Sequence, residues 1–147
     1  MLEYAGKRIM FTGDAEETVL EEYIAAYKDS YNVDVLKVGH HGSSNATSSE
    51  FIKAIDPEYA IIQCGKGNSY KHPHQETLQI LQSHEGGITL YRNDTNGHIT
   101  MSVSNSGVIN IDVDYDTTQE TNYVHGGMIT NNIPFIEYYN NRLKMAV

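Results

Sequence analysis

Several side chains that can bind metals or move protons stand directly after apolar, strand-like runs. Asp14 follows one such run, and the adjacent pair His40 and His41 follows the next, just before a Gly-Ser turn. His72 and His74 flank a proline after a third run. Because the parallel strands of an α/β layer bring their carboxyl ends to one edge, we expect these side chains to share a site there. Carboxylate and imidazole donors suit hard or borderline divalent metals, so the spacing predicts a polar, metal-dependent site.

The candidates differ in how strongly each one indicates function when it is considered alone. Asp14 is then most simply explained as the N-cap of a following helix, with Glu17 completing an acidic capping pattern. His40 and His41 favour a functional role, because adjacent side chains in an extended turn diverge and one can face a site while the other braces a neighbouring loop. The two histidines around Pro73 are explained equally well by an exposed, proline-stiffened loop. Only the combination of all five makes a shared site the better explanation.

The remaining residues of this chemistry indicate structural roles. His84, His98 and His125 have no comparable context, and we interpret them as solvated. Cys64, the only cysteine, ends an apolar run, which favours a buried small residue over a nucleophile. A single cysteine cannot form a disulfide within the chain, so cysteine pairing indicates no redox compartment.

Hydrophobic periodicity predicts the elements that must position these side chains. The order is β-α-β-α-β-α-β-β-β, an α/β layer closed by a small antiparallel section. The strands of this order are expected at residues 7–11, 33–38, 59–63, 88–91, 98–103 and 108–113, and the helices at residues 15–28, 48–55 and 75–83. Residues 2–4 are a candidate partner strand for residues 7–11 across the Ala-Gly pair at 5–6. Thr47 and Glu50 form a capping-box pattern at the start of the second helix. An Asn-Gly pair at 96–97 and a Ser-Gly pair at 106–107 predict turns.

Size and charge limit the classes of function. A chain of 147 residues can bury one ordinary core. Its net charge of −9 argues against a broad nucleic-acid-binding face, but a metal site would supply positive charge of its own, so nucleic acid stays open as a substrate. No apolar run approaches the length of a membrane span. Residues 114–147 are rich in Asn, Tyr and Thr, and we interpret them as an extension of a domain at residues 1–113.

Four segments in the same order resemble a known family. Residues 11–17, with Thr-Gly-Asp, residues 34–43, with Gly-His-His-Gly-Ser, residues 59–65, and residues 72–78, with His-Pro-His, resemble the metallo-β-lactamase-fold domain of competence proteins of the ComEC type. Bacterial choline-phosphate esterases of the same superfamily are also similar. The resemblance covers residues 2–103 and leaves out the extension.

The resemblance implies a role for each of the main candidates. Asp14 would bridge two metal ions, zinc or manganese, and His72 would be the last metal ligand. His40 or His41 would be catalytic, by contacting substrate or by stabilising charge near the metals. Such a metal pair activates a bound water and clamps phosphate oxygens, so the bond hydrolysed would be a phosphoester.

The resemblance covers only one half of the superfamily's fold. The principal metal motif, His-x-His-x-Asp-His, lies upstream of the Thr-Gly-Asp strand in the family, and this chain does not contain it. The chain therefore resembles the C-terminal half of an αββα sandwich, a mixed sheet flanked by helices. Asp14 and His72 alone are too few ligands for a tetrahedral metal site. By the same resemblance, His74 and Ser43 would contact substrate or support the ligands. We expect a fragment of a longer reading frame, an expressed domain piece or a degenerate relative.

Three functions remain open from the sequence. The first is part of a metal-dependent phosphodiesterase or nuclease linked to DNA uptake. The second is a choline-phosphate-type phosphoesterase, and the third is a non-catalytic binding or assembly module. A half-sandwich would leave one sheet face uncovered, so we expect either the missing N-terminal half or a second copy of the chain as partner, and a homo-oligomer in solution. The family also implies a bacterial, extracytoplasmic location.

Overall fold

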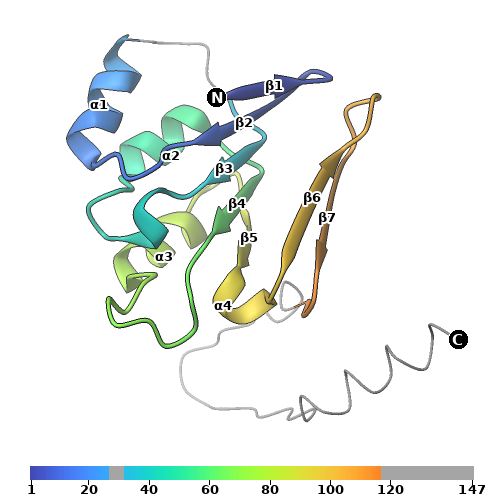
Figure 1. Ribbon diagram of the computed structural model, residues 1–147. Coiled ribbons are helices and arrows are strands. Elements are labelled where there is room, and N and C mark those ends of the chain that lie inside the picture. Colours follow the sequence, from blue (N-terminus) through green and yellow to red (C-terminus); the bar gives the residue numbers. More distant parts are fainter. Residues whose placement is uncertain (27–31, 117–147) are drawn as a thin grey trace, which may run out of the picture.

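The computed structural model describes residues 1–26 and 32–116, which form a five-stranded sheet, helices and a separate β-hairpin (Figure 1). The elements are β1 (Leu2–Tyr4), β2 (Lys7–Phe11), α1 (Glu17–Ala26), β3 (Val35–Lys37), η1 (Gly39–Gly42), α2 (Ser49–Ile55), β4 (Tyr59–Ile62), α3 (Gln75–Gln82), β5 (Thr89–Arg92), α4 (Asn93–Asn96), β6 (Ile99–Val103) and β7 (Ile109–Val113).

The five-stranded sheet is mixed, with the strand order β1-β2-β3-β4-β5. β1 and β2 are antiparallel and are joined by a tight turn at Ala5 and Gly6, which both have positive φ angles. From β2 to β5 every neighbouring pair is parallel, and a helix lies between consecutive strands along the chain. The predicted class, an α/β fold with a mixed sheet flanked by helices, is confirmed.

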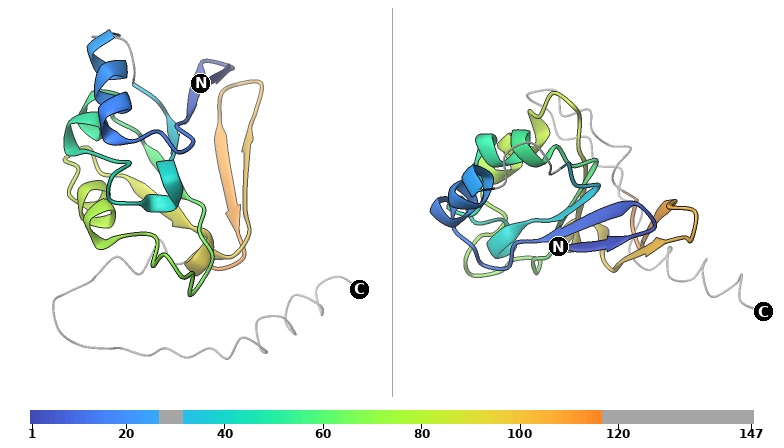
Figure 2. Two further views of the ribbon diagram at one scale, coloured as in Figure 1. Left: turned by 60° about the vertical axis from the view of Figure 1, so that its left-hand side comes forward. Right: turned by 90° about the horizontal axis from the view of Figure 1, so that it is seen from above.

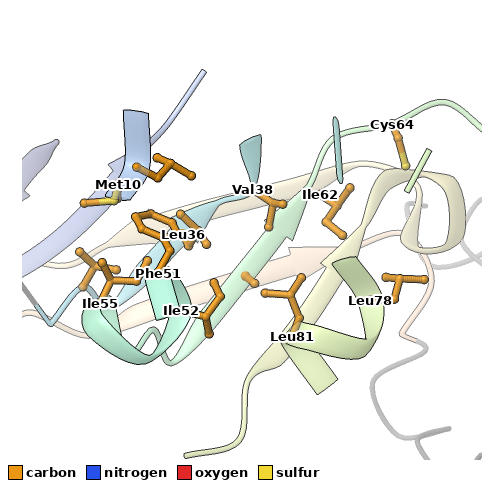
Figure 3. Packing of buried hydrophobic residues seen from close by; sticks show 13 residues of the cluster. Met10, Leu36, Val38, Phe51, Ile52, Ile55, Ile62, Cys64, Leu78 and Leu81 are labelled. Carbon is orange, nitrogen blue, oxygen red and sulfur yellow. The ribbon is translucent and has the colours of Figure 1, made fainter. Parts of the chain in front are cut away.

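The main core lies between this sheet and helices α1, α2 and α3, which lie on the same side of it (Figures 1 and 2). Apolar side chains from the strands face apolar side chains from the helices (Figure 3). The best-buried members are at most 1% exposed; they are Leu36, Val38, Ala60, Ile62, Phe51, Ile52, Ile55 and Leu81. Burying a side chain of this size stabilises a fold by about 1.5–3 kcal/mol, so this layer anchors the parallel strands whose ends carry the candidate site.

The β6–β7 hairpin lies on the side of the sheet away from the helices (Figures 1 and 2). Its residues alternate strictly between half-buried and exposed positions. The half-buried positions are all apolar: Ile99, Met101, Val103, Ile109, Ile111 and Val113. The exposed positions are polar: Thr100, Ser102, Asn110 and Asp112. The hairpin is therefore amphipathic, and its apolar face is covered only in part.

Contacts at both ends attach the hairpin to the sheet. At its tip, the Tyr4 hydroxyl donates a hydrogen bond to the Asn105 side chain, and a Cβ on Gly107 would lie 2.7 Å from the Ala5 carbonyl oxygen. At its base, the buried Asn96 side chain accepts a hydrogen bond from the Arg92 backbone N–H of β5 at 2.7 Å and donates to the Tyr115 carbonyl, after β7, at 2.8 Å. The chain reverses at the predicted Asn96–Gly97 turn, where Gly97 has a φ angle of 73°, but the reversal is preceded by the short helix α4, which the periodicity did not indicate.

Other local differences arise where side chains make hydrogen bonds that the periodicity does not reveal. The cap of α2 is Ser48, whose hydroxyl accepts from the Phe51 N–H at 3.1 Å, so the predicted capping box starting at Thr47 is wrong. His84 is not solvated, because its ring is 8% exposed and lies 2.6 Å from a carboxylate oxygen of Asp56.

His125 and most of the extension from residue 114 lie outside the described residues. Within residues 1–26 and 32–116, no helix is long and apolar enough to cross a membrane.

Candidate functional site

The loops that carry the candidate residues all leave the sheet at the carboxyl ends of parallel strands. β2 ends before the loop of Asp14, β3 ends before η1, and β4 ends before the loop of residues 65–74. Figure 1 shows η1 next to the loop between β4 and α3. The backbone confirms this contact, since the His74 N–H donates to the Gly42 carbonyl at 2.9 Å.

Asp14 lies beside η1 and is exposed. The His40 backbone N–H donates to the Gly13 carbonyl at 2.9 Å, and a Cβ on Gly39 would lie 2.9 Å from the Thr12 hydroxyl, so the two loops pack closely. Helix α1 begins at Glu17, which means that Asp14 is not its N-cap. The explanation of Asp14 as a helix cap is therefore wrong, and its carboxylate is not used to begin α1.

Both histidines of η1 have a left-handed backbone, with φ angles of 45° at His40 and 56° at His41. Residues other than glycine seldom adopt this conformation, which costs on the order of 1–3 kcal/mol and is concentrated at functional sites. The His41 Nδ1 lies 2.6 Å from the Gln63 carbonyl, which can only accept, so Nδ1 carries the proton. Nε2 of His41 is then the nitrogen that remains for a ligand.

The Nδ1 atom of His40 is the one buried side-chain nitrogen or oxygen among the described residues without a hydrogen-bond partner. Native proteins seldom leave such an atom unpaired, because an unsatisfied buried polar group costs about 1–3 kcal/mol. The orphaned atom therefore marks a place where a ligand atom or a further polar group would be favourable.

His72 lies at the centre of a group of aromatic rings. Its ring centroid is 5.8 Å from that of His40, 6.4 Å from that of His41, 4.7 Å from that of His74 and 5.7 Å from that of Tyr70. Burial lowers the pKa of His72, and the three neighbouring histidines lower it further. The neutral imidazole is thereby favoured, and this is the form in which histidine binds metals.

His74 has both ring nitrogens engaged within the protein. The Ser44 N–H donates to its Nδ1 at 3.1 Å, and its Nε2 donates to the Tyr70 carbonyl at 3.2 Å. These partners fix the neutral Nε2–H tautomer and join the loop of residues 65–74 to the segment after η1. Ser43 is 7% exposed, and its carbonyl accepts from the Thr77 hydroxyl at 3.0 Å. Both residues therefore support neighbouring loops through contacts inside the protein.

Sequence reasoning did not single out Asn68, Gln63 or Tyr70. The Asn68 side chain donates to the His72 carbonyl at 2.6 Å and accepts from the His72 N–H at 3.0 Å, so it fixes the backbone of that histidine. The Gly-Lys-Gly-Asn segment is a signal that could have identified it, because glycine and asparagine are typical turn residues and asparagine side chains in turns commonly bond to nearby backbone groups. No comparable signal marks the Gln63 carbonyl.

Cys64 is buried, as the sequence predicts, and lies near this edge of the sheet. Burial raises the pKa of its thiol to about 11, and the neighbouring Asp94 adds to that shift. A thiol with so high a pKa is a weak nucleophile at neutral pH, which agrees with a structural role.

The donor atoms at this edge suit a divalent metal in kind but not in number. Asp14 offers a carboxylate and His72 a neutral imidazole, which are ordinary ligands of zinc and manganese. Among the residues that the structure describes, however, no group of three or more His, Cys, Asp or Glu residues is placed to hold a metal ion. The described residues therefore do not complete a metal centre by themselves.

Known proteins that share this sequence region include three named for competence or recombination. The chain is 42% identical over 121 residues to ComE operon protein 3 of Bacillus subtilis, a match that covers 82% of this chain and 15% of that protein. It is 34% identical over 103 residues to the competence protein ComA of Neisseria gonorrhoeae, covering 70% of this chain and 15% of the relative. Recombination protein 2 of Haemophilus influenzae is 36% identical over 80 residues, which is 54% of this chain and 10% of that protein.

These similarities support the ComEC-type competence family that the four motifs indicated. The chain spans about 15% of the length of the first two relatives, so it corresponds to one region of much longer proteins. No protein-family model matches the chain. No solved structure matches it either.

Proposed function

We propose that this chain is part of a metal-dependent phosphoester hydrolase domain of the metallo-β-lactamase fold, acting on nucleic acid during DNA uptake. The observation that carries the proposal is the gathering of His40, His41 and His72 at the sheet edge that also presents Asp14. The names of the relatives, competence and recombination proteins, support the biological setting.

Asp14 and His72 would bind zinc or manganese together with ligands that are not among the described residues. When bound, such a centre supplies an activated water and stabilises charge on phosphate oxygens. In this proposal His41 contacts the substrate. His41 has its Nδ1–H engaged by the Gln63 carbonyl, so its Nε2 would accept a proton or, once protonated, donate to a phosphate oxygen.

A non-catalytic assembly module is the second candidate. The observation that favours it is the lack, within the described residues, of three metal-ligating side chains at one place. In this alternative, the strained histidines of η1 and the fixed loop of residues 65–74 would bind a partner surface, and loss of the Asp14 carboxylate would have little effect.

A chimera distinguishes the two candidates. The corresponding region of the Bacillus subtilis ComE operon protein 3 is replaced by this chain, and genetic transformation is measured in cells that lack the native gene. We expect the chimera to restore transformation, and Asp14→Asn or His72→Ala to abolish it without lowering the amount of chimera in the cell. Glu21→Gln, a carboxylate on the exposed surface of α1, is the matched control. Transformation that survives Asp14→Asn would overturn the hydrolase and favour the assembly module.

A further inference from the structure

Tyr70 is the most exposed large apolar side chain among the described residues, at 76%. Its ring stacks on that of His72, with centroids 5.7 Å apart and ring planes inclined by 21°. With one face of the ring toward His72 and most of the side chain in water, the other face is accessible. Exposed aromatic rings next to a candidate active site are a common means of binding a flat ligand.

The loop that presents Tyr70 is firmly held. Asn68 makes two hydrogen bonds to the backbone of His72 and one, at 2.9 Å, to the Gly65 carbonyl. The Lys71 N–H donates to the Asn68 carbonyl at 3.1 Å, and the Tyr70 carbonyl accepts from His74. The aromatic ring is therefore exposed on a braced backbone, and ligand binding would not have to order the loop first.

The charge of this loop is opposite to that of the whole chain. Between Glu58 and Glu76 the only charged side chains are Lys66 and Lys71, and both are exposed. The chain as a whole has a net charge of −9. The loop thus combines an aromatic face with two cations on a protein that otherwise repels polyanions, which is the combination that binds single-stranded nucleic acid.

We propose that Tyr70 is a stacking platform for one base of single-stranded nucleic acid, with Lys66 and Lys71 contacting the flanking phosphates. A base stacked on Tyr70 places its strand next to His72 and hence at the edge of the proposed centre. Bases inside a duplex are not accessible to such a ring, so the platform selects a single strand. The inference rests on the proposed hydrolysis of nucleic acid and names its substrate class.

Binding is measured without metal, so that the result does not depend on turnover. The 147-residue chain is titrated into a fluorescently labelled oligothymidylate of about 12 nucleotides in EDTA, and fluorescence anisotropy gives the affinity. Tyr70→Ala should weaken binding roughly 5- to 150-fold, the loss expected for one stacked base. Tyr70→Phe should retain the affinity because the ring is kept. Tyr4→Ala, which removes an exposed tyrosine in the edge strand β1, should leave binding unchanged.

Two further comparisons separate stacking from charge. An abasic oligonucleotide of the same length should bind the unsubstituted chain as weakly as oligothymidylate binds the Tyr70→Ala variant. Replacing Lys66 and Lys71 by alanine should reduce the slope of log affinity against log salt by roughly 1.4, as expected for two phosphate contacts to a single strand. Circular dichroism of each variant confirms that the chain is folded.

The platform is overturned if the unsubstituted chain does not bind oligothymidylate, if Tyr70→Ala binds as tightly as the unsubstituted chain, or if the abasic strand binds equally well. These outcomes are independent of hydrolysis. If Tyr70→Ala weakens binding but the Asp14→Asn chimera transforms normally, the platform is retained and the hydrolase is rejected. If Tyr70→Ala binds normally, only the platform is rejected.

Discussion

The two faces of the five-stranded sheet are covered to very different extents. On the helix side, strand and helix side chains form a continuous layer in which Leu36, Ile62 and Phe51 are at most 1% exposed. On the hairpin side, Val35 is fully buried, but Phe11 is 59% exposed and Ile61 is only half-buried. The difference shows that three helices complete one layer of the fold, whereas a two-stranded hairpin covers only part of the other.

The contrast also bears on the candidate site. Its loops leave the sheet at the well-covered parallel strands, and hydrogen bonds between the loops join the Asp14 loop to η1 and η1 to residues 65–74. The metal centre proposed above would need further ligands, and additional protein would reach the same edge over the open face. The four predictions below test this asymmetry, beginning with the largest expected effect.

Neighbouring isoleucines of β4 compare the two faces directly, because consecutive strand residues point to opposite sides. Ile62→Ala should lower the free energy of unfolding by about 2–5 kcal/mol, the range for truncation in a packed core. Ile61→Ala should lower it by clearly less, since that side chain is already partly in water. Urea denaturation of the two variants measures both values. Equal losses would mean that the hairpin side is as well packed as the helix side.

Gly42 lies where η1 meets the loop of residues 65–74. A Cβ there would lie 2.6 Å from the Pro73 Cβ, and the residue has a φ angle of 84°. Gly42→Ala should therefore destabilise the protein by about 2–4 kcal/mol through overpacking and backbone strain. Gly67→Ala is the control, because Gly67 also has positive φ but has open space around it and should lose only the strain contribution. Thermal melts that rank the two variants equally would show that the contact with Pro73 is unimportant.

The uncovered face should associate with a second copy of the chain in solution. Phe11 is its most exposed aromatic residue, and removal of an aromatic anchor from an interface commonly costs about 2 kcal/mol or more. Sedimentation at micromolar protein concentration should show a dimer or larger assembly, and Phe11→Glu should shift it toward monomer. Val19→Glu, on the exposed surface of α1, should not change the assembly. A monomeric unsubstituted chain with a cooperative melt would contradict this prediction.

The smallest effect is expected at the ion pair between Lys7 and Asp34, which are 2.6 Å apart. Burial alone would raise the pKa of Asp34, but hydrogen bonds from Lys7 and the Arg8 N–H outweigh it and lower that pKa. An acid with a lowered pKa stabilises the fold above its ordinary pKa, and this stability is lost as the pH falls through the lowered value.

Lys7→Met should therefore reduce stability at neutral pH only slightly and make the unfolding free energy less dependent on pH below about pH 4. Lys7→Arg should preserve both properties. Denaturant titrations over a series of pH values provide the measurement, and an unchanged acid profile for Lys7→Met would show that Asp34 owes its low pKa to the backbone alone.

Much of the architecture was predictable because it depends on local chemistry. Alternating and continuous apolar runs indicated every strand of the sheet, and the apolar faces of residues 48–55 and 75–83 indicated α2 and α3. The carboxyl ends of parallel strands always meet at one edge, so the approach of His40, His41 and His72 followed from the order of elements alone. Motif order likewise indicated the competence family that the relatives support.

Other features were decided only by contacts between residues distant in the sequence. Asp14 resembles a helix cap locally, yet α1 begins at Glu17, and the loop before it packs against η1 instead. The motif left open whether His74 contacts substrate or supports the ligands, and only the fold shows that Ser44 and Tyr70 engage both of its ring nitrogens.

The exposure of Tyr70 and the position of the hairpin over part of the sheet were likewise decided by contacts between residues distant in the sequence. A sequence pattern indicates which side chains share one face of a strand or helix. In residues 1–116 this pattern was sufficient to predict the order of strands and helices. Burial and hydrogen-bond partners depend on which other segments arrive at the same place, and that depends on the sum of packing over the whole fold.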